Sequence, residues 1–573
     1  PKAFILTIYM CGIFAVLQKI SSFNQSISKS FISKEFMKGQ SRGPENSVLK
    51  EINNNLILGF HRLAINGLDD ISNQPICIDG VYLICNGEIY NYKHILKNLN
   101  ITPQTNSDCE CIIHLYKKYG IQYTLENLDG VFSFLIYDSN IQQIYAARDP
   151  FGVRPMYIGT NNEDVVVISS LLKQIEGFNI RTTDFPSGSY INIHISSMNI
   201  LHISDYKKYT NFNYNMGLIP ITNINYCYST IYNLLIESVK KRVINSERNL
   251  ACLLSGGLDS SLISAIVAKW VPKGQLQTFS IGMMGGSDLK YAKMVSDHIN
   301  SDHTEIILSE QEFFDAIPEV IYNIESYDTT TVRASVGNYL VAKYISEHSD
   351  AKVIFNGDGS DELTGGYMYF HNCPNNMEFD YECKRLLNDI QYFDVLRSDR
   401  TISCHGLEAR TPFLDRTFVN NYLSLPIEFR NHNNNKNSNN KIEKWLLRQS
   451  IQENDPELLP NNVLWRSKEA FSDGVSSHNK SWYEIIQDRL NSQYSENDFK
   501  SKCEKYNHNK PTTVEQLYYR EIFESHFHNK DKIIPYFWMP KYSNVTDSSA
   551  RKLDIYKEKN KMSKTNLTID DNC

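Results

Sequence analysis

Short runs of apolar and β-branched residues, separated by Gly, Pro and Asn, dominate the chain up to about residue 205. Examples are LILGFHRLAI, VYLICNGEIY, VFSFLIYD, DVVVISS and GSYINIHI. Runs of this length and spacing are typical of strands in a strand-rich, layered structure. One stretch, DCECIIHLYKKY at 108–119, has the pattern of a clear helix. The sequence therefore predicts an α+β domain over residues 11–205.

The pattern changes near residue 225, where amphipathic helices begin to alternate with short apolar strands. NLACLLSGGLDSSLISAIVAKW is strand, loop and helix in turn, LQTFSIGM and AKVIFNGDG are strands, and IYNLLIESVKKRV and NYLVAKYISEH are helices. Such alternation favours a parallel sheet of the α/β type. We therefore predict a second domain over 225–545, with the boundary in the polar, Tyr- and Asn-rich stretch 206–224.

Three segments lack a pattern that would build a core. NHNNNKNSNNK at 431–441 is of low complexity and is predicted to be a solvated, disordered loop. Residues 546–573 are polar and are predicted to form a tail. Residues 1–10, PKAFILTIYM, are interpreted as an N-terminal extension, because no small-residue cleavage site follows their short apolar segment.

Composition narrows the class of protein. A chain of 573 residues with 41% apolar residues is long enough for two or three cores. A net charge of -7 and a pI of about 6.1 give no general basic field, so no nucleic-acid partner is indicated. The apolar runs have strand length and predict no membrane span. The 12 scattered cysteines suggest neither a zinc site nor a disulfide framework, which favours a reduced, cytoplasmic chain.

A Gly- and Ser-rich loop is the strongest local chemical signal. Ser255, Gly256 and Gly257, followed by Asp259 and Ser260, stand between the strand ACLL and a predicted helix. Glycines let backbone N–H groups turn toward an anion, and a helix N-terminus adds its dipole. The loop lacks the lysine of the common P-loop, so a cradle for a pyrophosphate leaving group in adenylyl transfer is favoured. A helix cap of the same composition is the alternative.

A second acidic cluster, GDGSDE at 357–362, also follows an apolar strand directly. Loops at the carboxyl ends of neighbouring parallel strands meet over one crevice. Asp361 and Asp259 are therefore predicted to share a Mg²⁺ ion that neutralises the pyrophosphate. An ordinary Asp/Gly turn is the alternative for this cluster.

Cys11 stands just behind Met10 and opens the apolar run GIFAVL. If the chain began at Cys11, its thiol and its free α-amine would form a nucleophile and a base on one residue. Such an amine has a pKa of about 7.7 to 8.0, so much of it is available as a base near neutral pH. The alternative is a small buried residue at the start of a strand. With residues 1–10 attached, the nitrogen of Cys11 is a peptide nitrogen and this base is absent.

Ordered blocks of sequence resemble those of one family. In the first half these are CGIF, RGPE, HRLAI, CNGEIYNY, SDCE, LDGVFSF and RDPFGVRP, and in the second LLSGGLDSS, SYDTTTVRAS, GDGSDELTGGY, HGLEARTPFLD and WRSKEAFSDGV. From Cys11 to about residue 540 the chain resembles glutamine-dependent asparagine synthetase. The resemblance implies a layered αββα glutaminase domain, followed by a PP-loop synthetase domain with a parallel sheet. β-Lactam synthetases share the second half, but Cys11 argues against them.

The resemblance implies roles in the first domain. Cys11 would attack the glutamine carboxamide, and Asn86 with the amide of Gly87 would form the oxyanion hole. Arg62 would bind the glutamine α-carboxylate, and Glu88 and Asp108 would bind its α-ammonium. Backbone positions would complete this pocket at Leu63, Ala64, Ile65 and Asn66. A surface salt bridge is the alternative for Arg62.

It also implies roles in the second domain. ATP would be held by the Gly- and Ser-rich loop together with Leu253, Ile281, Asn356 and Gly357. Thr330 and Arg333 would bind aspartate, and Lys468 would stabilise charge on the transferring phosphate. Surface salt bridging for Arg333 and a solvated charge for Lys468 are the alternatives.

Two positions depart from the usual family pattern. Asp358 stands where a glutamate implicated in adenylate formation is usual, and Asn356 where serine is usual. One methylene less draws a carboxylate back by about 1.3 Å, and misplacement on that scale can cost roughly a hundredfold in rate. We therefore expect Asp358 to weaken synthesis unless the main chain compensates.

The sequence predicts an ATP- and Mg²⁺-dependent ligase that makes asparagine from aspartate with glutamine as nitrogen donor, and a homodimer is possible for it. Ammonia from the first domain would reach the second through a shielded passage, which the resemblance implies. One alternative is a different glutamine-dependent amidotransferase that adenylates another carboxylate, and Thr330 and Arg333 argue against it. The other is a catalytically weakened protein that binds glutamine and ATP, motivated by Asp358 and the extension.

Overall fold

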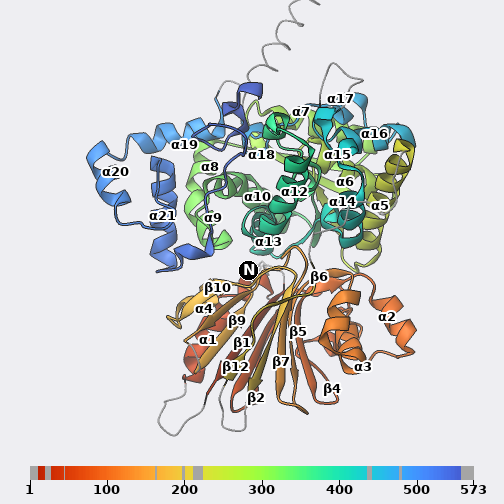
Figure 1. The fold of residues 1–573 in the computed structure, drawn as a ribbon, viewed down its shortest axis with the longest axis vertical. Helices are drawn as coiled ribbons and strands as arrows, with labels where there is room; N and C mark the ends of the chain where they lie inside the picture. Colours follow the sequence, from red (N-terminus) through yellow and green to blue (C-terminus); the bar gives the residue numbers. More distant parts are fainter. Residues whose placement is uncertain are drawn as a thin grey trace, which may run out of the picture.

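The structure, a computed structural model, describes residues 11–19, 27–43, 45–161, 164–195, 201–210, 223–434, 442–476 and 480–556. Two domains are stacked on each other, a strand-rich N-terminal domain below and a helix-rich domain above (Figure 1). The predicted extension, most of the predicted boundary stretch and the end of the predicted tail lie outside the described residues.

In the residues that the structure describes, the N-terminal domain has two antiparallel sheets and four α-helices. Its strands are β1 (Gly12–Gln18), β2 (Asn46–Asn53), β3 (Leu56–Arg62), β4 (Ile76–Ile78), β5 (Val81–Ile89), β6 (Gly130–Asp138), β7 (Gln143–Arg148), β8 (Tyr157–Thr160), β9 (Val165–Ser169), β10 (Arg181–Asp184), β11 (Ser189–Ile195), β12 (Leu201–Ile203) and β13 (Lys207–Lys208). Its helices are α1 (Lys29–Met37), α2 (Tyr92–Leu99), α3 (Glu110–Asn127) and α4 (Lys173–Glu176).

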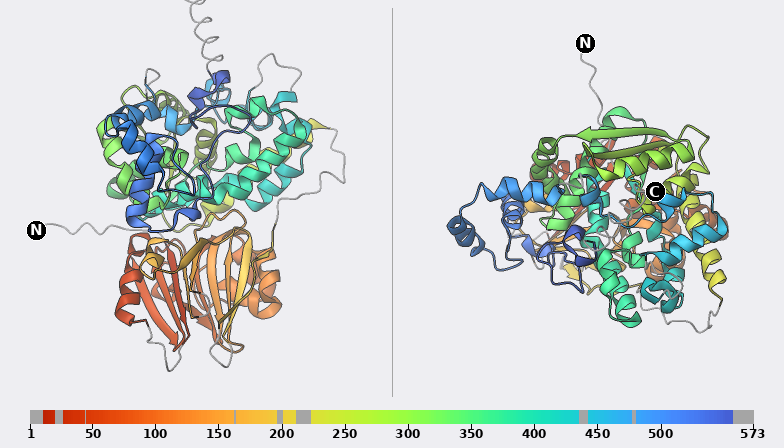
Figure 2. Two further views of the ribbon diagram at one scale, coloured as in Figure 1. Left: turned by 60° about the vertical axis from the view of Figure 1, so that its left-hand side comes forward. Right: turned by 90° about the horizontal axis from the view of Figure 1, so that it is seen from above.

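The two sheets pack face to face between helices, which confirms the layered arrangement. One sheet has the order β10-β8-β9-β1-β3-β2, and the other runs β12-β11-β7-β6-β5-β4, with β13 paired to β11. Alternate residues of β1, such as Ile13 and Ala15, face the opposite sheet, while Phe14 and Val16 face the helix side. Strand side chains alternate between the two faces, so each sheet buries both of its faces. Helices α1 and α4 cover one sheet, and α2 and α3 lie beside the other (Figures 1 and 2).

The helix predicted over 108–119 is longer than expected, and the short helices α1, α2 and α4 were not predicted. Helix α3 continues to Asn127 through Gly120, whose φ of +79° and open surroundings let the chain kink without a clash. Helices α1 and α2 are only nine and eight residues long. Segments of two turns carry too little periodic pattern to be recognised reliably.

The C-terminal domain consists of a five-stranded sheet among helices. Its strands are β14 (Leu250–Leu253), β15 (Gln277–Met283), β16 (Asp302–Leu308), β17 (Val353–Phe355) and β18 (Glu408–Arg410). The helices before β18 are α5 (Ile224–Ile244), α6 (Leu258–Ala268), α7 (Ser287–Ile299), α8 (Glu310–Asp315), α9 (Ile317–Ile324), α10 (Thr329–His348), α11 (Ser360–Thr364), α12 (Asn376–Asp389) and α13 (Asp394–Ser403). Those after it are α14 (Arg416–Ser424), α15 (Ile427–Arg430), α16 (Trp445–Asn454), α17 (Asn461–Leu464), α18 (Phe471–Gly474), α19 (Trp482–Asn491), α20 (Glu496–Cys503) and α21 (Val514–His526).

All neighbouring strands of this sheet are parallel, in the order β16-β15-β14-β17-β18. Strands β14 and β17 lie side by side at its centre, so the loops that follow them meet over one crevice. This confirms the predicted α/β sheet and the placement of both polar loops at one edge.

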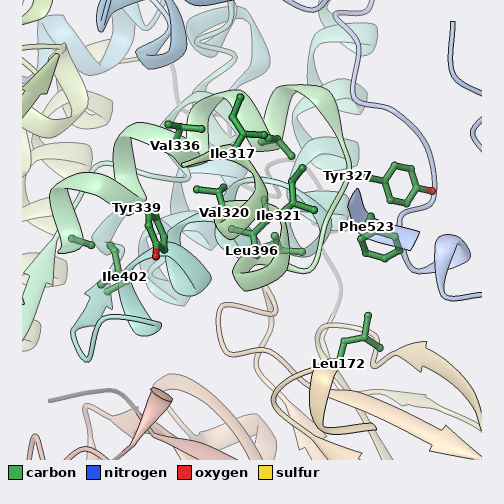
Figure 3. Packing of buried hydrophobic residues seen from close by; sticks show 14 of the residues in the cluster. Leu172, Ile317, Val320, Ile321, Tyr327, Val336, Tyr339, Leu396, Ile402 and Phe523 are labelled. Carbon is green, nitrogen blue, oxygen red and sulfur yellow. The ribbon is translucent and has the colours of Figure 1, made fainter. Parts of the chain in front are cut away.

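Helix α13 joins the packing of the two domains. Its Leu396 and Ile402 lie in one buried apolar cluster with residues of α9 and α10 (Figure 3). Leu172 of the N-terminal domain belongs to the same cluster. A second cluster combines Leu63 and Phe151 of the first domain with core residues of the second. Both apolar clusters therefore contain residues of the two domains, so the domains share a hydrophobic interface.

The predictions for the Asn-rich loop and for the start of the tail are wrong in part. Asn431 and His432 are buried, and the amide of Asn433 donates to the carbonyl of Phe370 at 2.9 Å. Residues 435–441 lie outside the described part. Beyond residue 545, Asp547 and Leu553 are packed against the second domain. Asn431, Asn433 and Asp547 find hydrogen-bond or ion-pair partners, which polar composition alone does not reveal.

Candidate active sites in the two domains

Cys11 lies at the start of β1 with its thiol enclosed by backbone. Its Sγ donates to the carbonyl of Leu63 at 3.1 Å and accepts the N–H of Leu63 at 3.3 Å. Burial raises the pKa of the thiol to about 12, and the Leu63 hydrogen bond offsets only part of that rise. The thiol is therefore protonated at neutral pH and needs a base before it can act as a nucleophile. The structure of residues 1–10 is not described.

The predicted oxyanion-hole residues lie on β5. The Asn86 amide donates to the hydroxyl of Ser170 at 3.4 Å, and that hydroxyl also accepts the N–H of Ile13 at 3.1 Å. Asn86 is thereby connected to the strand that carries Cys11. A Cβ at Gly87 would lie 2.4 Å from the carbonyl oxygen of Val131. Glycine is required there because the neighbouring strand approaches so closely.

Arg62 and Asp108, of opposite charge, stay the predicted partners of a zwitterionic ligand. Arg62 donates to the carbonyls of Asp69, at 2.8 Å, and Gly67, and to Asn73 Oδ1 at 2.7 Å. It is buried and organises its own loop, and it forms no salt bridge with any residue of the described ranges. Asp108 accepts the N–H of Ile89 at 2.6 Å. Burial raises the pKa of Asp108 to about 6.

Glu88 belongs to an ion cluster between the domains. Its carboxylate lies 2.6 Å from the amide of Asn66 and 3.3 Å from the guanidinium of Arg410 at β18. Burial raises the pKa of Glu88, and the nearby carboxylates of Glu408 and Asp108 add to the rise. Arg410 was not predicted as a site residue, because no local motif connects it with Glu88 across more than 300 positions.

The backbone predicted to line the glutamine pocket is held by charged residues of both domains. The N–H of Ala64 donates to Glu45 at 2.7 Å, and Arg248 donates to the carbonyl of Ala64 at 2.7 Å. The N–H of Glu247 donates to the carbonyl of Ile65 at 3.1 Å. The loop after β3 is therefore fixed by contact with the second domain.

The Gly- and Ser-rich loop has the geometry expected of an anion cradle. Gly256 has a φ of +74°, and a Cβ there would lie 2.4 Å from the backbone nitrogen of Ala292. The hydroxyls of Ser255 and Ser260 are 3.0 Å apart, and the Ser260 hydroxyl accepts the N–H of Ser255 at 3.2 Å. Gly257 is the N-cap residue of α6, so the helix dipole points into the loop.

Asp259 and Asp361 converge, as predicted, and two lysines bind them. Lys444 Nζ lies 2.5 Å from Asp259 and 2.6 Å from Asp361, and Lys468 Nζ lies 2.6 Å from Asp361. Burial would raise the pKa of Asp361, but the two ammonium groups lower it to about 2. Lys468 is therefore a half-buried ion-pair partner and not a freely solvated charge. Lys444 was not predicted.

Side chains of α13 bind both residues that depart from the family pattern, Asn356 and Asp358. The amide of Asn356 donates to the hydroxyl of Ser398 at 2.6 Å. The carboxylate of Asp358 lies 2.7 Å from the guanidinium of Arg397, which also binds Asp394 at 2.8 Å. Burial raises the pKa of Asp358, although Arg397 counteracts it. Arg397 and Asp394 are further site residues that the sequence did not reveal.

A cavity of about 190 Å³ brings most of the predicted synthetase residues together. Its lining includes Leu253, Ser255, Gly257, Asp259, Ser260, Ile281, Thr330, Asn356, Gly357, Asp358, Asp361 and Lys468. Glu362, Tyr367, Asp394 and Arg397 line the same cavity and were not predicted. The cavity therefore joins a phosphate cradle to a region that carries both acidic and basic groups.

Arg333 does not line this cavity. It lines a smaller one of about 70 Å³, which shares Thr330, Tyr367 and Trp538 with the main cavity. The Arg333 guanidinium is buried in ion pairs with Glu515 at 2.6 Å and Asp547 at 2.7 Å. Salt bridging was the alternative considered for Arg333, but the pairing is internal and not at the surface.

The structure combines a glutaminase-type site with an ATP-type cavity, which defines a two-domain amidotransferase and ligase. A family model described as glutamine amidotransferase domain matches residues 10–199, and one described as asparagine synthase matches 230–381 and 374–546. The chain belongs to the family of glutamine-hydrolysing asparagine synthetases.

Relatives bear this out over nearly the whole chain. The asparagine synthetase [glutamine-hydrolyzing] of Gallus gallus is 40% identical and that of Homo sapiens 39%, each over 96% of this chain and 99% of the relative. A solved glutamine phosphoribosylpyrophosphate amidotransferase from B. subtilis is 17% identical over 52% of this chain and 81% of its own, with a TM-score of 0.30. In the described part of the chain, no helix has the length and apolarity to cross a membrane.

Proposed function

We propose that this chain makes L-asparagine from L-aspartate and L-glutamine, with conversion of ATP to AMP and pyrophosphate. The observation that carries the proposal is the common cavity of the Ser255–Ser260 loop, Asp358 and Lys468. Phosphate-binding and carboxylate-activating groups are thereby adjacent. A carboxylate is a poor acylating agent, so it must first gain a leaving group.

In the first domain, the thiolate of Cys11 attacks the glutamine carboxamide, forms a thioester and releases ammonia; water then releases glutamate. The α-amine of a processed Cys11 takes the thiol proton, since the buried thiol is protonated on its own. Asn86 and the N–H of Gly87 donate to the oxyanion. Arg62 binds the α-carboxylate of glutamine and Asp108 its α-ammonium.

In the second domain, an oxygen of the aspartate β-carboxylate attacks the α-phosphorus of ATP, and pyrophosphate leaves with the bonding electron pair. The Ser255–Ser260 loop holds the departing phosphates, and Lys468 neutralises their charge. Ammonia then attacks the β-aspartyl-AMP carbonyl, and AMP leaves. The apolar cluster that joins Leu63 and Phe151 to the second domain supports a shielded route between the sites.

Aspartate recognition is assigned to the end of the cavity near Asp358. Arg397 supplies a cation there, and Asp394 and Glu362 supply anions. A zwitterionic substrate needs both charges at fixed positions. Arg397 lines the main cavity and Arg333 only the smaller one, so the proposed place for aspartate is beside Arg397.

Mg²⁺ is proposed to accompany ATP. Asp259 and Asp361 both reach the single Nζ of Lys444, so their oxygens converge on one cation-sized point. Among the described residues no group of three or more metal-ligating side chains occurs. Phosphate oxygens would complete the coordination, as is usual for Mg²⁺, and the ion would neutralise the pyrophosphate.

Placement in the cytoplasm is proposed because every cysteine in the described ranges is free, which suits a reducing compartment. A homodimer stays a prediction, and light scattering of the purified chain checks it.

Transfer of ¹⁸O tests the adenylation step. Aspartate labelled with ¹⁸O in its β-carboxylate is turned over with ATP and glutamine, and the AMP is analysed by mass spectrometry. One ¹⁸O in AMP is expected, because the attacking oxygen leaves with the phosphate. Unlabelled AMP during asparagine formation would contradict the adenylate. Glutamine and ATP binding without turnover would favour the weakened binding protein.

A further inference from the structure

We propose that the segment Asp547–Leu553, here named the C-terminal strap, positions the loop that carries Lys468. Arg333 is its anchor and acts as a positioning residue. This inference rests on the proposed role of Lys468 in the synthetase reaction. It assigns a function to a part of the chain that the sequence predicted to be a polar tail.

The anchor end of the strap is a saturated ion cluster. Arg333 donates to Glu515 from Nε at 2.8 Å and from Nη2 at 2.6 Å, and to Asp547 from Nη1 at 2.8 Å and from Nη2 at 2.7 Å. The amide of Gln487 also donates to Asp547 at 3.0 Å. Two carboxylates thus already surround one guanidinium, and a substrate carboxylate would add a second excess negative charge.

The other end of the strap holds the Lys468 loop. Arg551 donates to the carboxylate of Glu469 at 2.9 Å and to the carbonyl of Asp473 at 2.8 Å. Ser549 donates to the carboxylate of Asp473 at 3.0 Å. Leu553 is 3% exposed, so the strap is also docked by apolar burial. Each contact falls within five residues of Lys468.

Arg466 connects Glu469, which the strap binds, with the phosphate cradle. Arg466 donates to Glu469 at 3.3 Å and, from its other terminal nitrogen, to the carbonyl of Gly256 at 3.0 Å. Glu469, Ala470, Phe471 and Ser472 all line the main cavity. The strap is therefore connected, through one glutamate, to both Lys468 and the loop that would hold pyrophosphate.

Positioning of this kind acts on turnover more than on aspartate binding. Lys468 Nζ lies 2.6 Å from Asp361, and a charged group must keep its place while the phosphate charge develops. A displacement of about 1 Å in a catalytic group can cost roughly a hundredfold in rate. The strap contacts Glu469 and Asp473 of the Lys468 loop, whereas aspartate binding is proposed for Arg397 and Asp394, so the aspartate KM is expected to stay unchanged.

The test compares Asp547→Asn and Arg551→Met with the matched control Lys541→Met. Lys541 belongs to the same C-terminal region but pairs with Glu378 and Glu382, outside the Lys468 loop. The measurements are ammonia-dependent kcat, aspartate KM and glutaminase kcat of the full chain. We expect both strap variants to lose about tenfold or more in synthetase kcat, with aspartate KM and glutaminase kcat within about twofold of wild type. Lys541→Met is expected to match wild type.

Asp547→Glu keeps the charge and is expected to recover much of the rate. The double variant Arg333→Met, Asp547→Asn is expected to have a kcat no lower than that of the poorer single variant. Both substitutions break the same ion pair, so their effects should not add. Retained glutaminase activity reports that each variant is folded.

Two results would overturn the inference. In one, Arg333→Met raises aspartate KM tenfold while Asp547→Asn leaves kcat unchanged, which would make Arg333 a substrate ligand. In the other, Asp547→Asn lowers aspartate KM, which would make the strap a displaceable plug. If wild type itself makes no asparagine, the proposed function fails; if wild type is active and the strap variants equal it, only the strap inference fails.

Discussion

Arg42 Nε donates to the main-chain carbonyl of Cys11 at 2.8 Å. The same guanidinium binds Asp399 of α13 at 2.7 Å and the hydroxyl of Ser403 at 2.8 Å. Helix α13 also carries Arg397, which holds Asp358. One buried side chain thus joins the residue of the glutaminase nucleophile to the helix that shapes the synthetase cavity.

Arg42→Lys is expected to uncouple the two reactions. Lysine keeps the charge but cannot bridge the Cys11 carbonyl and Asp399 with a planar fork of donors. We expect the ratio of glutamate to asparagine formed to rise above that of wild type by about twofold or more, with ammonia-dependent synthesis less affected. Amino-acid analysis of both products measures the ratio. An unchanged ratio would show that this contact carries no coupling. Lys240→Met, which removes an exposed ion pair with Glu237, is the matched control.

Removal of residues 1–10 is expected to switch the glutaminase on. The Cys11 thiol has a pKa raised to about 12 by burial, so without the α-amine almost none of it is thiolate at neutral pH. A chain that begins at Cys11 should hydrolyse glutamine about a hundredfold faster or more than a chain that retains the extension. Intact mass identifies the form, and glutamate release gives the rate. Equal rates would refute the role of the α-amine.

As the pH is lowered, the affinity for glutamine is expected to decrease before ammonia-dependent asparagine synthesis does. Burial raises the pKa of Asp108 to about 6, and its ionised form, not its neutral form, attracts the α-ammonium of glutamine. Affinity is therefore present above pH 6 and is lost as the pH falls below it, by about tenfold per unit. The glutamine KM measured from pH 5 to 8 checks this, with the ammonia-dependent reaction as control. Asp108→Asn should raise the KM throughout and weaken its pH dependence.

Lys444 is expected to stabilise the protein as a built-in counter-ion. Lys444→Met leaves Asp259 and Asp361 facing each other with Lys468 alone, and breaking a buried pair costs about 3 to 5 kcal/mol. Thermal unfolding in EDTA should show the loss, and added Mg²⁺ should restore more stability to the variant than to wild type. Lys269→Met, which removes the half-exposed pair with Asp455, should cost at most about 1 kcal/mol. Equal responses to Mg²⁺ would contradict a shared cation site.

The cavity-lining residues that the sequence predicted lie in local motifs. Ser255 to Ser260 and Asp358 to Asp361 follow strands, and parallel strands place such loops at one edge of the sheet. The layered first domain was also predictable, because its strands either alternate apolar and polar residues or are apolar throughout.

Residues that reach the sites from distant helices were not predictable. Lys444 precedes α16, and Arg397 and Asp394 belong to α13; none stands in a recognisable chemical motif. The partners of Arg333 lie 182 and 214 positions away, so its buried pairing depends on tertiary packing alone. The same holds for Asn431 and His432, where polar composition wrongly predicted exposure.

Nitrogen transfer between the two domains is the central claim, and isotope tracing tests it most directly. The chain beginning at Cys11 is supplied with aspartate, ATP, Mg²⁺ and [amide-¹⁵N]glutamine in the presence of excess unlabelled ammonium at slightly acidic pH. The account predicts asparagine that carries ¹⁵N in its side chain, because ammonia passes between the sites without mixing with solvent. Asparagine with the isotope content of the bulk ammonium, or no asparagine at all, would contradict it.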